Sequence, residues 1–241
     1  MRECFVKLVV NEDNAVVARA RPSATIVVVR DASEGLEVLL LKRNPDLAHM
    51  PGAWVFPGGK VDDSDTGETI EERARVAAAR ELMEEAGFHI DSATLLDFSH
   101  WLTPEIVKRR FATWFYLAVI EDHVPVVVDG SEIVDYRWLR PELALSEQLA
   151  GELQAPPPTL VTLTDIQRFE SAGELTRMVS DRHPPYFSPK LHKVPEGMLF
   201  LYPGDAGYET DSPAVTGPRH RMIMAPGVFD YDRSFDWPSR T

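Results

Sequence analysis

Three glutamates within one helical turn constrain the fold of this chain more than any other feature of its sequence. They belong to the segment Arg-Glu-Leu-Met-Glu-Glu-Ala-Gly-Phe at residues 80–88. Because residues three and four apart share one face of a helix, Glu81, Glu84 and Glu85 are expected to project their carboxylates toward a common point. Carboxylates this close raise each other's pKa, and a bound divalent cation relieves their repulsion. Ligation by carboxylates alone suits Mg2+ or Mn2+, whereas zinc prefers His and Cys.

The alternative interpretation of these acids is a solvated helix face, which is common in acidic proteins. Glycines on both sides favour a bounded site instead. A tight turn is expected at Pro57, Gly58 and Gly59 before the helix, and Gly87 is a natural C-terminal stop after it. The acids therefore lie on a loop-helix-loop element.

The same region resembles the signature of the Nudix hydrolase family: a Gly, five residues, a Glu, seven residues, then Arg-Glu-apolar-any-Glu-Glu-any-Gly-apolar. The second half matches at every position, with Glu72, Arg80, Glu81, Leu82, Glu84, Glu85, Gly87 and Phe88. The first half departs from the signature, because Gly59 lies thirteen residues before Glu72 where the family has six. Residues 60–71 are therefore expected to contain an inserted loop. Glu68 is an alternative first glutamate, but Glu72 has the spacing to Arg80 that the signature requires.

This resemblance implies an α+β protein with the Nudix fold, an α/β/α sandwich around a mixed β-sheet. It also implies a metal-dependent hydrolase in which water attacks one phosphorus of a diphosphate. Glu81, Glu84 and Glu85 are then the metal ligands, and Glu84 or Glu85 is also the candidate base for the attacking water. Arg80 is expected to hydrogen-bond a glutamate of the signature such as Glu72 and to hold the helix against the loop.

Residues outside the helix are candidates for the same site. The backbone of Gly58 and Gly59 is expected to approach the metal or the phosphate, because glycine allows close contact. Nudix domains often recruit one more acid or base from a loop, and Glu132, in the loop at residues 129–132, is the candidate here. The alternative for Glu132 is an exposed turn acid.

Four basic residues are candidates for contact with phosphate oxygens. Lys42 and Arg43 end a predicted strand, and a role in substrate binding is weighed against that of solvated charges. Arg109 and Arg110 invite the same interpretation, and for them solvated charges are preferred.

Short apolar, β-branched runs predict the elements around the helix. A hairpin of buried strands is expected at residues 24–30 and 37–42, and residues 53–56 lead into the glycine turn. The helix is expected at residues 70–86, and a further helix begins at Pro141. Further strands are predicted at residues 93–101, 110–120 and 133–139. This order is that of a Nudix domain, and the resemblance divides the chain into an N-terminal segment (1–20), a Nudix hydrolase domain (21–150) and a C-terminal extension (151–241).

The C-terminal extension has a different composition. A stiff proline connector is expected at residues 155–158, a helix near 162–180, and a strand pair at 198–202 and 220–224. Residues 203–207 are expected to form a turn. The exposed-strand character predicted for residues 198–202 makes a homodimer conceivable.

Charge and composition narrow the class of partner. The net charge of −13 argues against a nucleic-acid polymer, which needs a basic surface, but leaves a small-molecule diphosphate possible. No apolar stretch is long enough to span a bilayer, so no membrane partner is expected. The N-terminus lacks the apolar core of a secretory signal, and the single cysteine, Cys4, suits a reducing compartment. These features predict a cytoplasmic enzyme.

A longer resemblance bears on the substrate. Residues 39–45, 50–59 and 101–104 are similar to the Nudix branch that contains the mammalian peroxisomal acyl-coenzyme A diphosphatase, and this branch also enlarges the loop inside the signature. The resemblance implies cleavage of the pyrophosphate of coenzyme A or acyl-coenzyme A. An ADP-ribose, dinucleotide or nucleotide-sugar pyrophosphatase is the alternative, since Pro104 lies near where ADP-ribose cleavers place a proline. A non-catalytic Nudix-like ligand-binding module is a third hypothesis, although its expected mark, degenerate acids, is absent.

Overall fold

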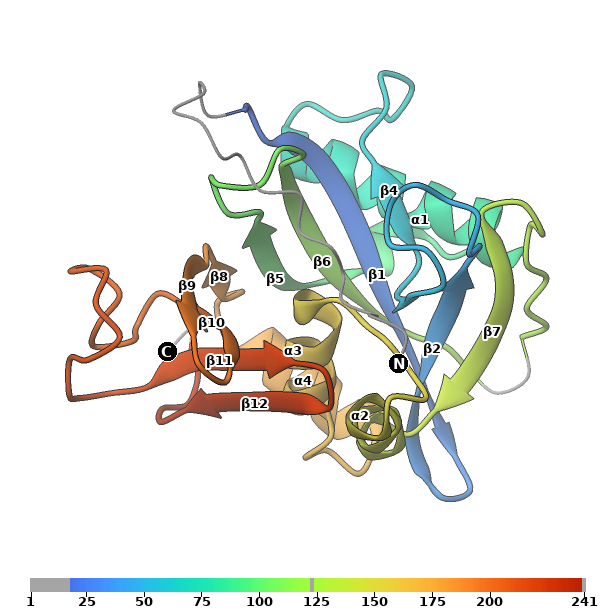
Figure 1. Ribbon diagram of the computed structural model, residues 1–241. Coiled ribbons are helices and arrows are strands. Elements are labelled where there is room, and N and C mark those ends of the chain that lie inside the picture. The colour runs from blue at the N-terminus through green and yellow to red at the C-terminus, as the bar shows by residue number, and fades with distance from the viewer. Residues whose placement is uncertain (1–17, 122–123, 240–241) are drawn as a thin grey trace.

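The computed structural model describes residues 18–121 and 124–239, so Cys4 and nearly all of the predicted N-terminal segment lie outside the described residues (Figure 1). A mixed sheet forms the centre of the molecule, in the order β3-β2-β1-β6-β5-β8, with β4 paired to β1 and β7 to β2. Its strands are β1 (Arg21–Ala32), β2 (Gly35–Arg43), β3 (Trp54–Val55), β4 (Gly58–Lys60), β5 (Leu96–Leu102), β6 (Phe111–Val119), β7 (Ile133–Leu139) and β8 (Tyr186–Phe187). The pairs β1–β6 and β5–β8 are parallel and the other pairs are antiparallel, so the predicted mixed sheet is confirmed.

Helices cover both faces of this sheet, as a sandwich requires. The helix α1 (Ile70–Ala86) lies on one face, and α2 (Pro141–Ala150), α3 (Pro157–Ile166) and α4 (Ala172–Asp181) lie on the other (Figure 1). The side chains of β1 alternate between the two layers: Ile26 and Val28 pack with α1, whereas Val27 and Val29 pack on the opposite face. Burial of both faces explains why this strand reads as an unbroken apolar run.

The extension adds a second, antiparallel sheet in the order β12-β11-β10-β9. Its strands are β9 (Lys190–Val194), β10 (Gly197–Leu201), β11 (His220–Ala225) and β12 (Val228–Arg233). The predicted pairing of residues 198–202 with 220–224 is confirmed, with Met198 opposite Met224. However, β10 is paired on both sides, by β9 and β11. The exposed strand edge that made a homodimer conceivable is therefore not present at β10.

The extension does not stand apart from the domain. Its strand β8 joins the main sheet, and one continuous core contains Trp101 and Phe115 from the domain together with Phe187, Phe200 and Tyr202 from the extension. The core is thus unbroken across the boundary predicted between residues 150 and 151. Among the described residues, none of the helices combines the length and the apolar character that crossing a membrane requires.

Two predicted elements are corrected. The helix expected at residues 162–180 is two helices, because Ser171 caps a new helix by accepting a hydrogen bond from the Glu174 N–H at 3.3 Å. The first of them, α3, begins inside the supposed proline connector, since Pro157 occupies its first turn, where proline is tolerated. The strand expected at residues 93–101 begins instead at Leu96, after a 3-10 turn (Ser92–Thr94) that Asp91 caps.

Candidate active site

The helix α1 begins and ends where its local sequence dictates. Thr69 and Glu72 form a capping box, in which the Thr69 hydroxyl accepts from the Glu72 N–H and the Glu72 carboxylate accepts from the Thr69 N–H, each at 3.2 Å. The helix ends at Gly87, which is in the left-handed conformation with φ 77° and donates its N–H to the Met83 carbonyl. One face of the helix is packed on the sheet through buried alanines and Leu82, and Glu85 is buried with them.

The sequence predicted a hydrogen bond between Arg80 and Glu72, but the structure does not show it. The Glu72 carboxylate is engaged in the capping box instead. The Arg80 guanidinium donates two hydrogen bonds to Asp65 of the inserted loop, at 2.9 and 3.0 Å, and one to the Lys60 carbonyl at 3.0 Å. Asp65 is almost completely buried. Burial alone would raise the pKa of Asp65, but hydrogen bonds from Arg80 and from the Asp62 N–H outweigh it and hold the pKa below its usual value.

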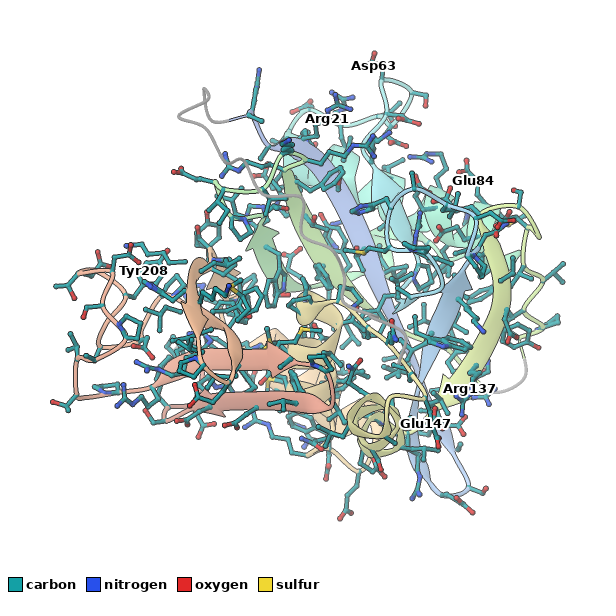
Figure 2. The ribbon with its side chains drawn as sticks, viewed as in Figure 1. Arg21, Asp63, Glu84, Arg137, Glu147 and Tyr208 are labelled. Carbon is teal, nitrogen blue, oxygen red and sulfur yellow. The ribbon has the colours of Figure 1, made fainter. Side chains whose placement is uncertain are left out.

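The insertion is therefore anchored to α1. Arg73, one helix position from the capping box, donates to the Asp65 carbonyl at 2.9 Å and to the Asp62 carbonyl at 2.7 Å. Asp63, by contrast, is at the exposed tip of the loop (Figure 2). The sequence analysis did not identify Asp65 as the partner of Arg80. The signal for it was present, because Arg80 was expected to bind a carboxylate and the inserted loop is rich in aspartate.

Two of the helix acids face the glycines of β4. The buried carboxylate of Glu85 accepts a hydrogen bond from the Gly58 N–H at 2.9 Å. A side chain at Gly59 would collide with the carboxylate of Glu81, and one at Gly58 would collide with the Ala24 carbonyl of β1. The glycines are thus required for close approach, as predicted, but the groups that they approach in this structure are protein carboxylates and strand β1.

These carboxylates hold a proton more tightly than ordinary ones. Burial raises the pKa of Glu85 to about 8, with a further rise from the charges of Glu81 and Glu132, although the Gly58 N–H opposes it. Burial also raises the pKa of Glu81 against the opposing influence of Arg80, and the charges of Glu84 and Glu132 add to the rise. Four negative groups therefore influence one another here.

Glu84 is the most exposed of the three helix acids. Its side chain is 57% exposed, on the outer side of α1 (Figure 2), where it accepts a hydrogen bond from Arg80 at 3.1 Å. Arg80 also bonds Glu81, at 2.9 Å. As the side chains stand, no three His, Cys, Asp or Glu side chains of the described part of the chain lie close enough to hold a metal ion. The three carboxylates do not converge on one point as expected. Arg80 binds Glu81 and Glu84, and the Gly58 N–H binds Glu85.

The donor set nevertheless fits a hard divalent cation in its chemistry. Every candidate ligand is a carboxylate, which suits Mg2+ or Mn2+. The raised pKa values of Glu81 and Glu85 reflect a concentration of negative charge that a cation would relieve. The side chain of Glu84 is 57% exposed and, among the described residues, is held only by its ion pair with Arg80 at 3.1 Å, so it is the least buried of the three candidate ligands.

Glu132 joins this cluster from the loop before β7. It faces the same cavity as Glu81, is 53% exposed at its side chain, and pairs with Arg43 at 2.8 Å. Asp129 orders the loop by accepting hydrogen bonds from the Ser131, Glu132 and Ile133 N–H groups at 2.6 to 2.9 Å. The structure thus brings together Glu81, Glu85, Glu132 and Arg43, and their roles as site residues stay a prediction.

Lys42 is not brought into the cavity. Its ammonium lies over the ring of Trp54, 5.7 Å from the ring centroid, and it is not among the residues that line the site. Arg43 does line the cavity, but it is engaged by Glu132 and by the His49 carbonyl at 3.2 Å. Lys42 and Arg43 therefore have different roles. Arg43 positions the Glu132 carboxylate, and Lys42 is no longer a candidate for substrate contact.

A single cavity of about 530 Å3, which we call the site cavity, joins the carboxylates to an apolar wall. Trp101 and Phe115 of the sheet form part of this wall, with ring centroids 6.2 Å apart, and Tyr202 of the extension packs 5.8 Å from Trp101. Phe200 and residues 156–158 of the extension line the same cavity. The extension therefore helps to build the site, which sequence reasoning did not foresee.

Between these two regions the cavity is lined by small polar residues of β1 and β6. Thr25 lies opposite Phe115, and Ser23 lies opposite Thr113, so these four side chains share one face of the sheet. Ser23 is only 6% exposed, and its buried hydroxyl has no hydrogen-bond partner among the described residues. A buried hydroxyl without a partner points to a polar ligand at this place.

Comparison with known proteins bears on the same region. The sequence model of the NUDIX domain matches residues 19–159. A Caenorhabditis elegans protein whose name assigns it to the nudix hydrolases is 27% identical, over 84% of this chain and 79% of that protein. The acyl-coenzyme A diphosphatase NUDT19 of Homo sapiens is 26% identical, over 75% of this chain and 74% of that protein. Among solved structures, a NUDIX hydrolase from Alicyclobacillus acidocaldarius has a TM-score of 0.62 at 23% identity, covering 67% of this chain and 97% of that chain, and this likeness concerns the fold.

Proposed function

The chain belongs to the Nudix hydrolase family, because the matched domain spans more than half of its length, and from this premise we propose which diphosphate it cleaves. It is a hydrolase of diphosphate bonds in small molecules, and enzymes of this family generally need divalent metal ions. We propose that its substrate is coenzyme A or an acyl-coenzyme A, and that its metal ion is Mg2+ or Mn2+.

The observation that carries this proposal is the apolar wall of the site cavity. A diphosphate bound at Glu81 and Glu132 would have one substituent directed along the cavity toward Trp101, Phe115 and Phe200. A pantetheine arm, and still more an acyl chain, can bury its apolar surface there, at roughly 0.8 kcal/mol for each buried CH2 group. The ribose of ADP-ribose or a nucleotide sugar would instead leave hydroxyl groups unpaired against aromatic rings. The name of the human relative supports the same substrate class.

The carboxylates have separate tasks in this proposal. Glu81, Glu84 and Glu85 would hold the cation, and the Gly58 N–H fixes the orientation of Glu85. When bound, a divalent cation lowers the pKa of a water molecule and offsets the charge of the diphosphate. Arg80 positions Glu81 and Glu84 and is itself fixed by Asp65.

Glu132 takes the proton of the attacking water, in place of Glu84 or Glu85. It lies outside α1, lines the cavity and is half exposed, whereas Glu85 is buried with one oxygen on Gly58. Hydrolysis then forms one bond from the water oxygen to phosphorus and breaks the bridging bond to the other phosphate. Glu132→Gln is expected to lower kcat while leaving Mn2+ affinity near that of the wild type, whereas Glu81→Gln should lower both.

The substrate is tested by comparing kcat/KM for coenzyme A, acyl-coenzyme A esters of increasing chain length, ADP-ribose, NADH and diadenosine polyphosphates. We expect acyl-coenzyme A to be the best of these, and Phe200→Leu to reduce the preference for longer acyl chains. Phe229→Leu is the matched control, because Phe229 belongs to the same small sheet but does not line the cavity. Faster cleavage of ADP-ribose or a dinucleotide would contradict the proposal. The cytoplasmic location expected from the sequence stays a prediction.

A further inference from the structure

A second hollow, of about 700 Å3, adjoins the site cavity and is lined largely by cations. Five exposed basic side chains surround it, and we call them the basic cluster: Arg19, Arg21, Lys60, Lys108 and Arg109. Lys60 and Arg109 also line the site cavity, so the two hollows are contiguous. Figure 2 shows Arg21 at the start of β1. A concentration of positive charge in a chain of net charge −13 calls for an explanation.

The positive charge of the basic cluster is not balanced within the described part of the chain. None of its five side chains forms an ion pair with a carboxylate of the residues described. Like charges held together in this way repel one another unless an anion joins them. The chain has 38 acidic residues against 25 basic ones, so five basic side chains gathered around one hollow without a carboxylate partner among the described residues favour an anionic ligand.

The backbone that carries the basic cluster is ordered by a sixth cation. Arg110 is buried, and its guanidinium donates to the Thr103 carbonyl at 3.1 Å and to the Ala18 carbonyl at 3.0 Å. The Arg21 N–H donates to the Arg110 carbonyl at 2.9 Å. Arg110 thus has a structural role, while its neighbours Lys108 and Arg109 remain exposed. The sequence had grouped Arg109 and Arg110 together, and the structure separates them.

Strand register connects the basic cluster to the carboxylates. Lys60 lies opposite Ser23 in the β1–β4 pair, and Arg21 is two residues before Ser23, so all three side chains share one face of the sheet. Ser23 is the buried hydroxyl that lacks a partner. Lys60 directly follows Gly59, which contacts Glu81. A ligand with its diphosphate at Glu81 therefore has the Ser23 hydroxyl and the basic cluster within reach of its adjacent group.

We propose that the basic cluster binds a phosphate monoester that the substrate carries in addition to its diphosphate. The inference rests on the proposed function, in which the nucleoside of coenzyme A bears a 3'-phosphate close to the diphosphate. Arginine and lysine are the side chains that recognise such dianions through charge-assisted hydrogen bonds. ADP-ribose and NADH lack this group, so the basic cluster discriminates between coenzyme A and the competing substrates.

The test compares coenzyme A with 3'-dephospho-coenzyme A, which has the same diphosphate and the same pantetheine arm. The variant is Arg21→Gln/Lys108→Gln, because these two residues line the second hollow and not the site cavity. The control is Arg177→Gln/Lys193→Gln, which changes the net charge equally at exposed positions of the extension. We expect the wild type and the control to favour coenzyme A in kcat/KM by about tenfold or more, and the variant to lose most of this preference.

A binding measurement keeps the inference separate from the proposed function. Calorimetry with 3',5'-adenosine diphosphate and with AMP requires no turnover. If no coenzyme A derivative is cleaved, the proposed function fails, but tighter binding of 3',5'-adenosine diphosphate than of AMP, lost in the Arg21→Gln/Lys108→Gln variant, supports the basic cluster as a phosphate subsite.

Three results would overturn the inference. The first is equal binding of the two nucleotides by the wild type. The second is an equal loss of preference in the variant and in its charge-matched control. The third is an effect of added inorganic phosphate on the cleavage of dephospho-coenzyme A that occurs in the wild type but not in the variant. That result would assign the basic cluster to free phosphate instead.

Discussion

Glu85 is a carboxylate in a place that disfavours its negative charge, because it is buried and lies near other acids. Its carboxylate is 5% exposed, yet it accepts a single hydrogen bond, from the Gly58 N–H, and faces the negative charges of Glu81 and Glu132. A carboxylate whose pKa is raised by burial costs stability, because the folded protein disfavours its charged form. The cost is understandable if the carboxylate is held ready for a cation.

Asp65 offers a test of how the acids are positioned. Asp65→Asn keeps the shape of the side chain but removes the charge that holds Arg80, so Arg80 is expected to bind Glu81 and Glu84 more tightly and to compete with the cation. We expect kcat/KM to fall about tenfold or more. Asp63→Asn in the same loop is the matched control, since Asp63 is fully exposed. Equal activity of the two variants would contradict the role of Asp65, and higher Mn2+ in the assay should partly restore Asp65→Asn.

His220 makes a prediction about pH. It is completely buried, its Nδ1 donates to the Pro203 carbonyl at 2.6 Å, and burial lowers its pKa to about 4. Between pH 6.5 and 4 the unfolded chain takes up a proton at this histidine and the folded chain does not, so the free energy of unfolding falls as the pH falls. The loss attributable to His220 should reach about 3 kcal/mol near pH 4. Urea unfolding at several pH values checks this, and an identical pH dependence in His220→Gln would contradict it.

At the scale of elements, the site depends on how closely β4 approaches α1. Gly59 lies directly against the Glu81 carboxylate, so a methyl group at this position would collide with that carboxylate. We expect Gly59→Ala to displace Glu81 and to lower kcat about a hundredfold, as small displacements of catalytic groups do. Gly173→Ala is the control, because Gly173 lies in α4 with open space around it. Unchanged turnover in Gly59→Ala would show that the approach of β4 is not required.

The elements differ in how far their own sequences determine them. The start and end of α1 follow from Thr69, Glu72 and Gly87, which act through local hydrogen bonds, so the helix was predictable residue by residue. The partner of Arg80 was not, because Asp65 lies fifteen residues away in a loop whose path no local rule determines. Glu132 was predictable as a candidate, but its pairing with Arg43 joins residues 89 positions apart.

The extension shows the same limit more strongly. Apolar runs predicted part of its strands. They did not predict that Tyr202 would pack against Trp101, or that Phe200 and Tyr202 would line the site cavity. The break between α3 and α4 was missed because apolar periodicity continues across it, while a single serine cap decides it. Contacts between distant segments, rather than propensity, determined these features.

At the scale of the whole molecule, domain and extension share one core, and this predicts one unfolding transition. Met222 of β11 is completely buried in the same cluster as Phe115 of β6. We expect calorimetry to show a single cooperative transition, and Met222→Ala to lower its midpoint by about 5 °C or more. Two resolved transitions, with Met222→Ala affecting only one, would mean that the extension folds separately.

The molecule as a whole thus combines an acidic helix that suits a cation, an apolar wall supplied jointly by the main sheet and the extension, and a basic cluster at the edge of the site. The measurement that tests this combination most directly is phosphorus NMR of the products formed from an acyl-coenzyme A with Mg2+ or Mn2+. We expect 3',5'-adenosine diphosphate and acyl-4'-phosphopantetheine from the wild type, and neither from Glu84→Gln/Glu85→Gln. Intact acyl-coenzyme A in the wild-type reaction, with release of AMP from ADP-ribose under the same conditions, would contradict it.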